Sequence, residues 1–506
     1  MRSNIRRLIE LSLGVCENLV RKGKDGLYRF MDQNDGQEIS AHYGATHAAA
    51  AFIIWGHETG DAVLYQKGVA LLHSILQRWD RNRALPDFHF DFNNFALCLV
   101  EGLVDEDTGA LIRTTVCNTP DSNHDTINWL PMRWFVNKKR MEWASDNKYE
   151  QIISHCRDTI EQASNADGGV EDRLPYGMSF NLQYDVATVA VLQYLRINEE
   201  KLDLSKQLGF LLNAVAPDGD INYQGRGTNQ IFAWGLWIYL LASSRQDIAL
   251  GNALDYLSPR LPKMLENGNM MLNEWKGEEK YLWWDYHYAS VYTAHCLLWL
   301  ILAYKDFGKK YISPEYPTTT ETGFHVYRSE NFFVCWFDGR SKYLAEKGPA
   351  IAAIWSKKHG MICKGAFGPW QGVFGKKYLY EDAVLKNFCG LIRITRNKDW
   401  SRNKYIHRLL PDLRDEDKLL LQPSFSSISI NETDTSLEIS WQSNNSEEMI
   451  FNIPAYTAKL MCKLFVDEIE SPVICTGTIK NQYGWAFLYQ TRALKGRIMK
   501  LVIAKQ

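Results

Sequence analysis

The sequence of 506 residues lacks the features that mark several large classes of protein. Its ten cysteines are scattered and form no Cys-x-x-Cys pair, so we expect reduced core thiols and no metal cluster. The most apolar stretch, 289–304, is broken by Ser290, Thr293 and His295 and falls short of the ~18 apolar residues that a membrane-spanning helix needs. The formal net charge is only −2, which argues against nucleic acid as a partner. A glycine-rich phosphate loop between a strand and a helix is also missing, so nucleotide chemistry has no support.

The N-terminal segment lacks the pattern of a signal peptide. Residues 1–7 are basic, but Glu10 and Glu17 follow at helical spacing, which is typical of an amphipathic helix. We therefore expect a cytoplasmic protein without a cofactor, unless an export signal has been trimmed. The sequence gives no indication of the oligomeric state.

Aromatic residues are abundant: 17 Trp, 25 Tyr and 22 Phe make up 13% of the chain. Flat rings stack on the faces of sugars as well as fill cores. The hydrophobic period divides the chain into two parts. Up to about Lys305 apolar residues recur at helical spacing. This pattern predicts helices at roughly 5–22, 42–57, 61–79, 92–103, 126–140, 146–164, 181–197, 201–214, 228–244, 246–258, 260–267 and 286–305.

The predicted helices fall into pairs joined by loops. The loop Asn165-Ala-Asp-Gly recurs as Ala216-Pro-Asp-Gly, near a period of 51 residues, which fits a repeat of helical hairpins. Such pairs close into a ring or stack as a solenoid. Two prolines and a threonine run mark residues 306–322 as a linker, and residues 323–506 then alternate as strands do. We expect a helical domain at 1–305 and an antiparallel β domain at 323–506.

Several of the most apolar predicted helices begin with a cluster of polar side chains. If the inner helices of a ring all point the same way, these clusters gather at one end, where helix dipoles favour anions. Helix capping explains many such residues singly. The candidate substrate-binding residues among them are Asn94, Trp129, Asn181, Tyr223, Asn229 and Trp284.

This order of helical repeats, linker and β half resembles the (α/α)-toroid polysaccharide lyases: the hyaluronate and chondroitin lyases, alginate lyases and heparinase II/III-like proteins. Asn128-Trp129 is similar to their Asn-Trp pair, Tyr184 stands where their catalytic tyrosine is expected, and Gly225-Arg226 is similar to the Gly-Arg step that follows it. The resemblance implies an α+β multidomain fold, with an N-terminal toroid followed by an antiparallel β-sandwich-like domain. One feature departs from the family, because no histidine lies between Asp167 and Tyr184.

The implied reaction is β-elimination on an acidic polysaccharide or oligosaccharide that contains uronic acid: removal of the C5 proton and expulsion of the C4 oxygen. Asn128, with His124 one helical turn before it, could neutralise the sugar carboxylate. Arg226 could lower the pKa of Tyr184, whose phenol would act first as base and then as acid. Alternatively His287 is the base and Tyr288 the acid.

Three other hypotheses stay open. A glycoside hydrolase on the same toroid would need paired carboxylates, for which Asp167, Glu171, Asp185, Asp218, Asp220 and Asp285 are available. Asp167 and Asp218 lie in Asp-Gly turns, where turn chemistry already accounts for them. A C5 epimerase would share the proton abstraction without the expulsion. The third alternative is a glycan-binding protein without catalytic activity.

Overall fold

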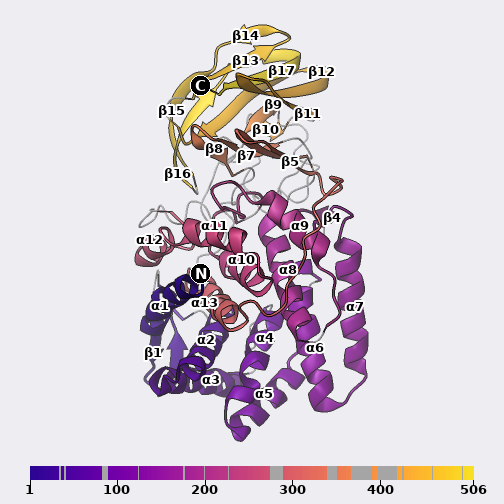
Figure 1. The fold of residues 1–506 in the computed structure, drawn as a ribbon. Helices are drawn as coiled ribbons and strands as arrows, with labels where there is room; N and C mark the ends of the chain where they lie inside the picture. The colour runs from indigo at the N-terminus through magenta and orange to yellow at the C-terminus, as the bar shows by residue number, and fades with distance from the viewer. Residues whose placement is uncertain are drawn as a thin grey trace.

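The computed structural model describes residues 1–33, 36–38, 42–82, 89–123, 125–174, 177–198, 200–225, 227–273, 289–338, 350–365, 389–396, 419–423, 427–457, 460–481, 483–492 and 494–505. Helices dominate the chain up to Lys305 and strands dominate from Phe324 onward, with the strands stacked on one end of the helical part (Figure 1). None of the described helices is long and apolar enough to cross a membrane.

Six of the described helices form a closed inner ring, because each contacts the next and the last contacts the first. The inner helices are α2 (Gly44–Thr59), α4 (Phe90–Val100), α6 (Leu130–Ala144), α8 (Leu182–Ile197), α10 (Phe232–Ser243) and α13 (Ala289–Lys305). The outer layer is α1 (Arg2–Leu19), α3 (Ala62–Asn82), α5 (Glu106–Asn118), α7 (Lys148–Ala163), α9 (Ser205–Ala214), α11 (Asp247–Leu257) and the short α12 (Leu261–Glu266). The predicted (α/α) toroid is confirmed.

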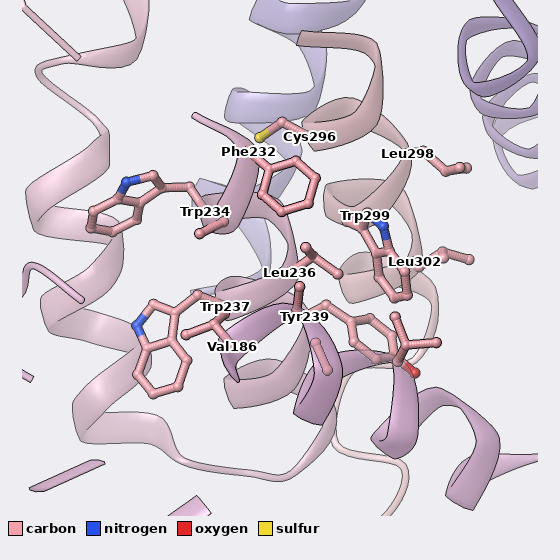
Figure 2. Close-up of a cluster of buried hydrophobic side chains, with 14 of the residues drawn as sticks. Val186, Phe232, Trp234, Leu236, Trp237, Tyr239, Cys296, Leu298, Trp299 and Leu302 are labelled. Carbon is pink, nitrogen blue, oxygen red and sulfur yellow. The ribbon is translucent and has the colours of Figure 1, made fainter. Parts of the chain in front are cut away.

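The two layers differ in burial as the sequence pattern requires. Every residue of inner helix α10 is buried. Outer helix α1 buries one face, at Ile5, Leu8, Ile9, Ser12 and Cys16. Figure 2 shows the core where α10 and α13 meet, with aromatic rings from both helices interleaved.

A glycine allows the close packing of these two helices. A Cβ atom on Gly235 would lie 2.6 Å from the carbonyl oxygen of Cys296, so only glycine fits there. Trp299 packs edge-on against Tyr239 in the same core, with ring centroids 5.0 Å apart. Such aromatic burial accounts for much of the unusual ring content of the chain.

Helix α5 was not predicted. Its N-cap Asp105 accepts a hydrogen bond from the backbone of Thr108, which is a clear start signal. Its apolar stripe, however, is sparse, with only Ile112 and Val116 as large buried side chains. Two short hairpins also interrupt the helical part: β1 (Val20–Lys22) with β2 (Tyr28–Phe30), and β3 (Asp172–Leu174) with β4 (Gly177–Ser179).

The predicted Asp-Gly recurrence is a repeated turn of one geometry. In each case the Asp carboxylate accepts from the backbone nitrogen two residues on, and the glycine has a positive φ that disfavours other residues. The turn follows α7 at Asp167-Gly168 (φ 93°) and α9 at Asp218-Gly219 (φ 92°). A third copy, which the sequence reading missed, follows α1 at Asp25-Gly26 (φ 83°).

The described strands of the β half form two antiparallel sheets. The smaller sheet has the order β5-β6-β7-β8. Its strands are β5 (Phe324–Arg328), β6 (Phe332–Phe337), β7 (Ala350–Ser356) and β8 (Gly360–Lys364). The larger sheet comprises β9 (Gly390–Arg396), β10 (Leu419–Pro423), β11 (Ser427–Glu432), β12 (Ser436–Ala455), β13 (Cys462–Val466), β14 (Ile469–Ser471), β15 (Ile474–Asn481), β16 (Gly484–Gln490) and β17 (Leu494–Ala504).

The smaller sheet lies between the toroid and the larger sheet. Phe332 and Val334 of β6 join a core with the larger sheet. Phe333, Cys335 and Phe337, on the opposite face of the same strand, join the core of the toroid. Alternate side chains of β6 therefore pack on opposite sides, one set against the larger sheet and the other against the toroid. The predicted β-sandwich-like half is confirmed.

Polar contacts fasten the sandwich to the turns that follow α7 and α9. The Asp167 carboxylate accepts from the backbone nitrogen and the hydroxyl of Thr322, at 2.9 and 2.7 Å. The Lys364 ammonium at the end of β8 lies 2.8 Å from Asp218 and 2.9 Å from Asp220. It also donates to the Tyr256 hydroxyl. These contacts place the N-terminal ends of the inner helices toward the sandwich.

Candidate functional site

Polar and aromatic side chains collect at the sandwich-facing end of the ring, which we call the mouth. It is made by the residues that begin each inner helix and by a short 3₁₀ helix, η2 (Ile127–Trp129). The mouth residues considered below are His42, Tyr43, His47, His89, Phe92, Asn94, Asn128, Trp129, Tyr184, Phe232, Tyr292 and His295.

One side of the mouth is a group of touching rings from α2, α4 and η2. The imidazoles of His42 and His89 have centroids 4.4 Å apart, and His89 lies 5.6 Å from the Trp129 ring. Tyr43 stacks on Phe92 with centroids 4.4 Å apart. His42 is half-buried and Trp129 is 8% exposed. The sequence-predicted Trp129 is therefore placed beside two histidines.

The opposite side joins α8, α10, α13 and α2. The His295 imidazole stacks on Phe232 at 4.7 Å with nearly parallel planes, and His47 is 5.1 Å from His295. The Tyr184 ring lies edge-on to Phe232 at 6.5 Å and is half-buried. Phe232 thus connects the predicted catalytic tyrosine to the buried histidines.

Two asparagines bring hydrogen-bonding capacity to the mouth. Asn94 on α4 is fully buried, and both polar atoms of its side chain are without a hydrogen-bond partner in the described structure. Asn128 on η2 is 3% exposed, and its Oδ1 is likewise unsatisfied among the described contacts. Because buried amides are normally paired, these atoms are suited to hold a ligand or an ordered water.

Burial keeps three of the mouth histidines, His42, His47 and His295, neutral. It lowers the pKa of His42 to about 4 and that of His47 to about 3, the latter despite a bond between His47 Nδ1 and the Tyr43 carbonyl. Burial, with His47 nearby, also lowers the pKa of His295. At neutral pH these imidazoles are hydrogen-bonding groups without charge.

Three of the predicted substrate-binding residues have structural contacts. The side chain of Asn181 caps α8 by accepting from the backbone nitrogen of Gln183. Tyr223 is fully buried and donates to the carbonyl of Ala214. Asn229 is 1% exposed and donates to the Leu272 carbonyl at 3.3 Å. We leave these three out of the proposed site.

The remaining predicted site residues, His124, Arg226, Trp284, His287 and Tyr288, lie outside the described residues, as does Asp285. The sequence reading in turn missed His42, His47, His89 and His295. A signal for two of them was present: His42 and His89 directly precede inner helices, as the polar clusters of the other helices do.

Most of the described carboxylates considered for a hydrolase have other partners. Asp167 binds Thr322, and Asp218 and Asp220 bind Lys364. Glu171 also takes part in a hydrogen bond, an ion pair or another electrostatic interaction. Asp185, in the first turn of α8, is the exception: it is fully buried, both of its carboxylate oxygens lack a described hydrogen-bond partner, and burial raises its pKa well above the ordinary value for a carboxyl group.

A further pair of carboxylates, which the sequence reading did not single out, shares one guanidinium. Arg133 of α6 reaches Asp91 at 3.1 Å and Asp125 at 2.7 Å. Burial raises the pKa of Asp91 to about 6. Partial burial would also raise the pKa of Asp125, but Arg133 and His155 lower it overall. His155 belongs to outer helix α7, so Asp125 lies toward the outer layer.

Within the described part of the chain, no group of three or more His, Cys, Asp or Glu side chains is arranged to hold a metal ion. The ten cysteines are free thiols, and seven are buried.

No protein-family model and no curated protein matches this sequence. Solved structures with a similar helical part include the α-1,6-mannanase GH76A of a Salegentibacter species, at a TM-score of 0.42 and 13% identity over 59% of this chain and 98% of that one. A variant of unsaturated glucuronyl hydrolase from Streptococcus agalactiae has a TM-score of 0.44 and 12% identity over 61% and 93%. A glycosyl hydrolase of family 88 from Bacteroides vulgatus has a TM-score of 0.41 and 10% identity over 60% and 99%. Likenesses this distant leave function to be argued from the residues of this chain.

Proposed function

We propose that this protein is a carbon–oxygen lyase that cleaves a uronic-acid-containing glycan by β-elimination at the mouth of the toroid. The observation that carries the proposal is the chemistry of the mouth. Amides, neutral imidazoles, a phenol and an indole gather there, while the described carboxylates considered for acid–base hydrolysis have partners elsewhere or are buried.

These groups suit proton abstraction next to a carboxylate. The C5 proton of a uronate is weakly acidic, because its loss places more negative charge beside a carboxylate. The Nδ2 group of Asn128 would donate to that carboxylate and stabilise the enolate-like transition state by about 3 kcal/mol, while its Oδ1, which lacks a described partner, would accept from a sugar hydroxyl. Trp129 offers a ring for the sugar to stack on.

Tyr184 is the proposed proton-transfer group. Its phenolate would take the C5 proton, electrons would flow to expel the C4 oxygen, and the same phenol would return the proton to that oxygen. A phenol with an ordinary pKa of about 10 needs a nearby cation for the first step, and Arg226 is the candidate. His124, His287 and Tyr288 remain candidates for the same chemistry.

A glycoside hydrolase is the second candidate, and one observation favours it. Asp91 and Asp125 share Arg133, and their pKa values are shifted in opposite directions, as in an acid and base pair. Against it, Asp91 is fully buried and Asp125 is held by His155 of the outer layer. We therefore favour a structural role for this ion triad.

The two candidates leave different products. The protein would be incubated with alginate, hyaluronate, chondroitin sulfate, heparin and polygalacturonate, and ultraviolet absorbance and reducing ends measured together. β-Elimination yields new ends with the absorbance of a C4–C5 double bond. If new reducing ends appear without that absorbance, and if Asp125→Asn abolishes them, the protein is a glycoside hydrolase and not a lyase.

Two further outcomes would also overturn the lyase. Deuterium from solvent appearing at C5, without chain cleavage, would indicate an epimerase. Binding without any chemical change would indicate a glycan-binding protein.

A further inference from the structure

A hollow with a cavity volume of about 410 Å³ lies at one edge of the sandwich. Its walls are the turn between β5 and β6, the turn between β7 and β8, and the residue that follows β17. The lining residues are Asn331, Phe332, Ser356, Lys357, Lys358 and Lys505.

The hollow is separate from the mouth. In the antiparallel smaller sheet, Phe332 begins β6 and Ser356 ends β7 at one end of the strands, whereas Lys364 ends β8 at the other end. Lys364 is the residue that binds the toroid turn at Asp218 and Asp220. The hollow therefore lies one strand length away from that fastening.

Positive charge dominates the lining. Lys505 is matched by Glu432 at 2.7 Å. Burial would raise the pKa of Glu432, but Lys505, Ser329, Asn331 and Tyr327 lower it to about 2, so this carboxylate stays ionised and well bonded. Lys505 and Glu432 therefore neutralise each other, and the ammonium of Lys505 is not available to a ligand.

The other two ammonium groups are available to a ligand. The Lys357 side chain is 61% exposed and pairs with Glu330, itself 81% exposed, at 2.6 Å. An exposed pair of this kind contributes only ~0–1 kcal/mol and is readily exchanged for another anion. Lys358 is exposed and has no ion pair among the described contacts.

The backbone around the hollow is fixed before any ligand arrives. The Lys357 nitrogen donates to the carbonyl of Asn331 at 2.8 Å, which ties the two turns together. The hydroxyl of Ser356, which is 3% exposed, accepts from the His359 nitrogen at 3.0 Å. A preformed hollow of this size falls within the range of ~300–1,000 Å³ that is usual for ligand pockets.

We propose that this hollow is a second anion site that holds a carboxylate or sulfate group of an acidic glycan outside the mouth; the choice of a glycan rests on the proposed function. Ammonium groups bind either anion as point charges. A long chain held at two places gains effective concentration at the mouth, whereas a fragment too short to span them gains nothing.

The test uses the full chain and a Lys357→Glu/Lys358→Glu variant, with binding measured by calorimetry. The probes are alginate for carboxylates, heparin for sulfates, inorganic sulfate for the free anion and dextran as a neutral polymer. We expect affinity for at least one acidic polymer to fall roughly tenfold in the variant, with dextran unbound by either protein. KM for the polymer should rise, while kcat and KM for a disaccharide stay unchanged.

Lys139→Glu/Lys148→Glu is the control, because it changes the net charge equally at two lysines of helices α6 and α7 in the toroid, which pair with Glu142 and Asp146. Equal polymer affinity in the wild type and the Lys357→Glu/Lys358→Glu variant would overturn the proposal, as would a loss that the control reproduces. Binding of inorganic sulfate alone would also overturn it. If polymers bind through the two lysines but none is cleaved, the proposed function fails and the second anion site stands.

Discussion

The toroid and the sandwich bury polar groups differently. In the toroid, buried side-chain atoms without a hydrogen-bond partner occur at the mouth, at Asn94, Asn128, His47 and His295. They also occur elsewhere, at Ser12 of outer helix α1 and at the core indole nitrogens of Trp134, Trp234, Trp237 and Trp299. Among the described residues of the sandwich, the corresponding atom is the indole nitrogen of Trp441. Unsatisfied buried groups cost stability, and at the mouth they include both polar atoms of the Asn94 amide and both ring nitrogens of His295, which are suited to bind a ligand. In the sandwich, the buried ammonium of Lys364 is instead paired with two carboxylates of the toroid.

Tyr184→Phe should produce the largest change. The variant keeps the ring that packs on Phe232 and removes only the hydroxyl. We expect kcat to fall by about 10²–10⁴, the usual contribution of a proton-transfer group, with thermal stability nearly unchanged. The measurement is kcat on an active glycan beside a thermal melt. Near-normal kcat in Tyr184→Phe, with a loss in Tyr288→Phe, would transfer the role to Tyr288.

Lys364→Met tests whether Lys364 fastens the sandwich to the toroid. It leaves the carboxylates of Asp218 and Asp220 without their ammonium partner, and Asp220 is fully buried. Breaking a buried pair from one side destabilises by about 3–5 kcal/mol, which urea unfolding would measure. Lys357→Met is the matched control, since its exposed pair should contribute at most about 1 kcal/mol. Equal stability of the two variants would contradict the fastening role.

Asn128→Ala should affect activity more than stability. The Oδ1 atom of Asn128 has no described partner to lose, so the free energy of unfolding should change little. Loss of an amide donor to the substrate carboxylate should lower kcat/KM by about 10²–10³. Steady-state kinetics on an active glycan, alongside urea unfolding, separates the two effects. If the variant is destabilised yet fully active, Asn128 has a structural role and takes no part in catalysis.

Acid should lower the free energy of unfolding, because histidines that are neutral in the folded toroid take up protons when the chain unfolds. The pKa of His47 is about 3 in the folded protein and about 6.5 in an unfolded chain, so between these values only the unfolded chain binds the proton. The stabilisation is complete above pH 6.5 and is lost as pH falls toward 3. The slope is about 1.4 kcal/mol per pH unit for each such histidine. Urea unfolding from pH 7 to 5 should show this slope, reduced in His47→Gln; an identical slope in both proteins would contradict it.

More of the fold than of the candidate site could be predicted from the sequence. Helical spacing and the later period of two locate most of the elements, since burial of one face imposes those periods. Helix α5 escaped because only Ile112 and Val116 mark its buried stripe. The short strands β1 to β4 carry too few residues for a period to appear.

The candidate site was harder to predict because its residues come from separate helices. Asn128, Trp129 and Tyr184 were found because each lies in a polar helix start. His47 and His295 lie inside apolar helices, where sequence alone does not separate a core histidine from one at the mouth. Lys364 belongs to a strand, and its two carboxylate partners are more than 140 residues away in the chain.

The repeated Asp-Gly turn also determines where the β half is joined to the ring. After α7 and α9 the turn is attached to the sandwich, whereas after α1 its Asp25 carboxylate is taken by Arg29, 2.6 Å away on the same hairpin. The described attachments of the sandwich therefore lie on one arc of the toroid. Among the described residues, the turn after α1 has no such attachment. One local turn geometry therefore has two uses in this chain: it anchors the β half where the carboxylate pairs outward, and it closes a self-contained hairpin where a neighbouring arginine binds the carboxylate.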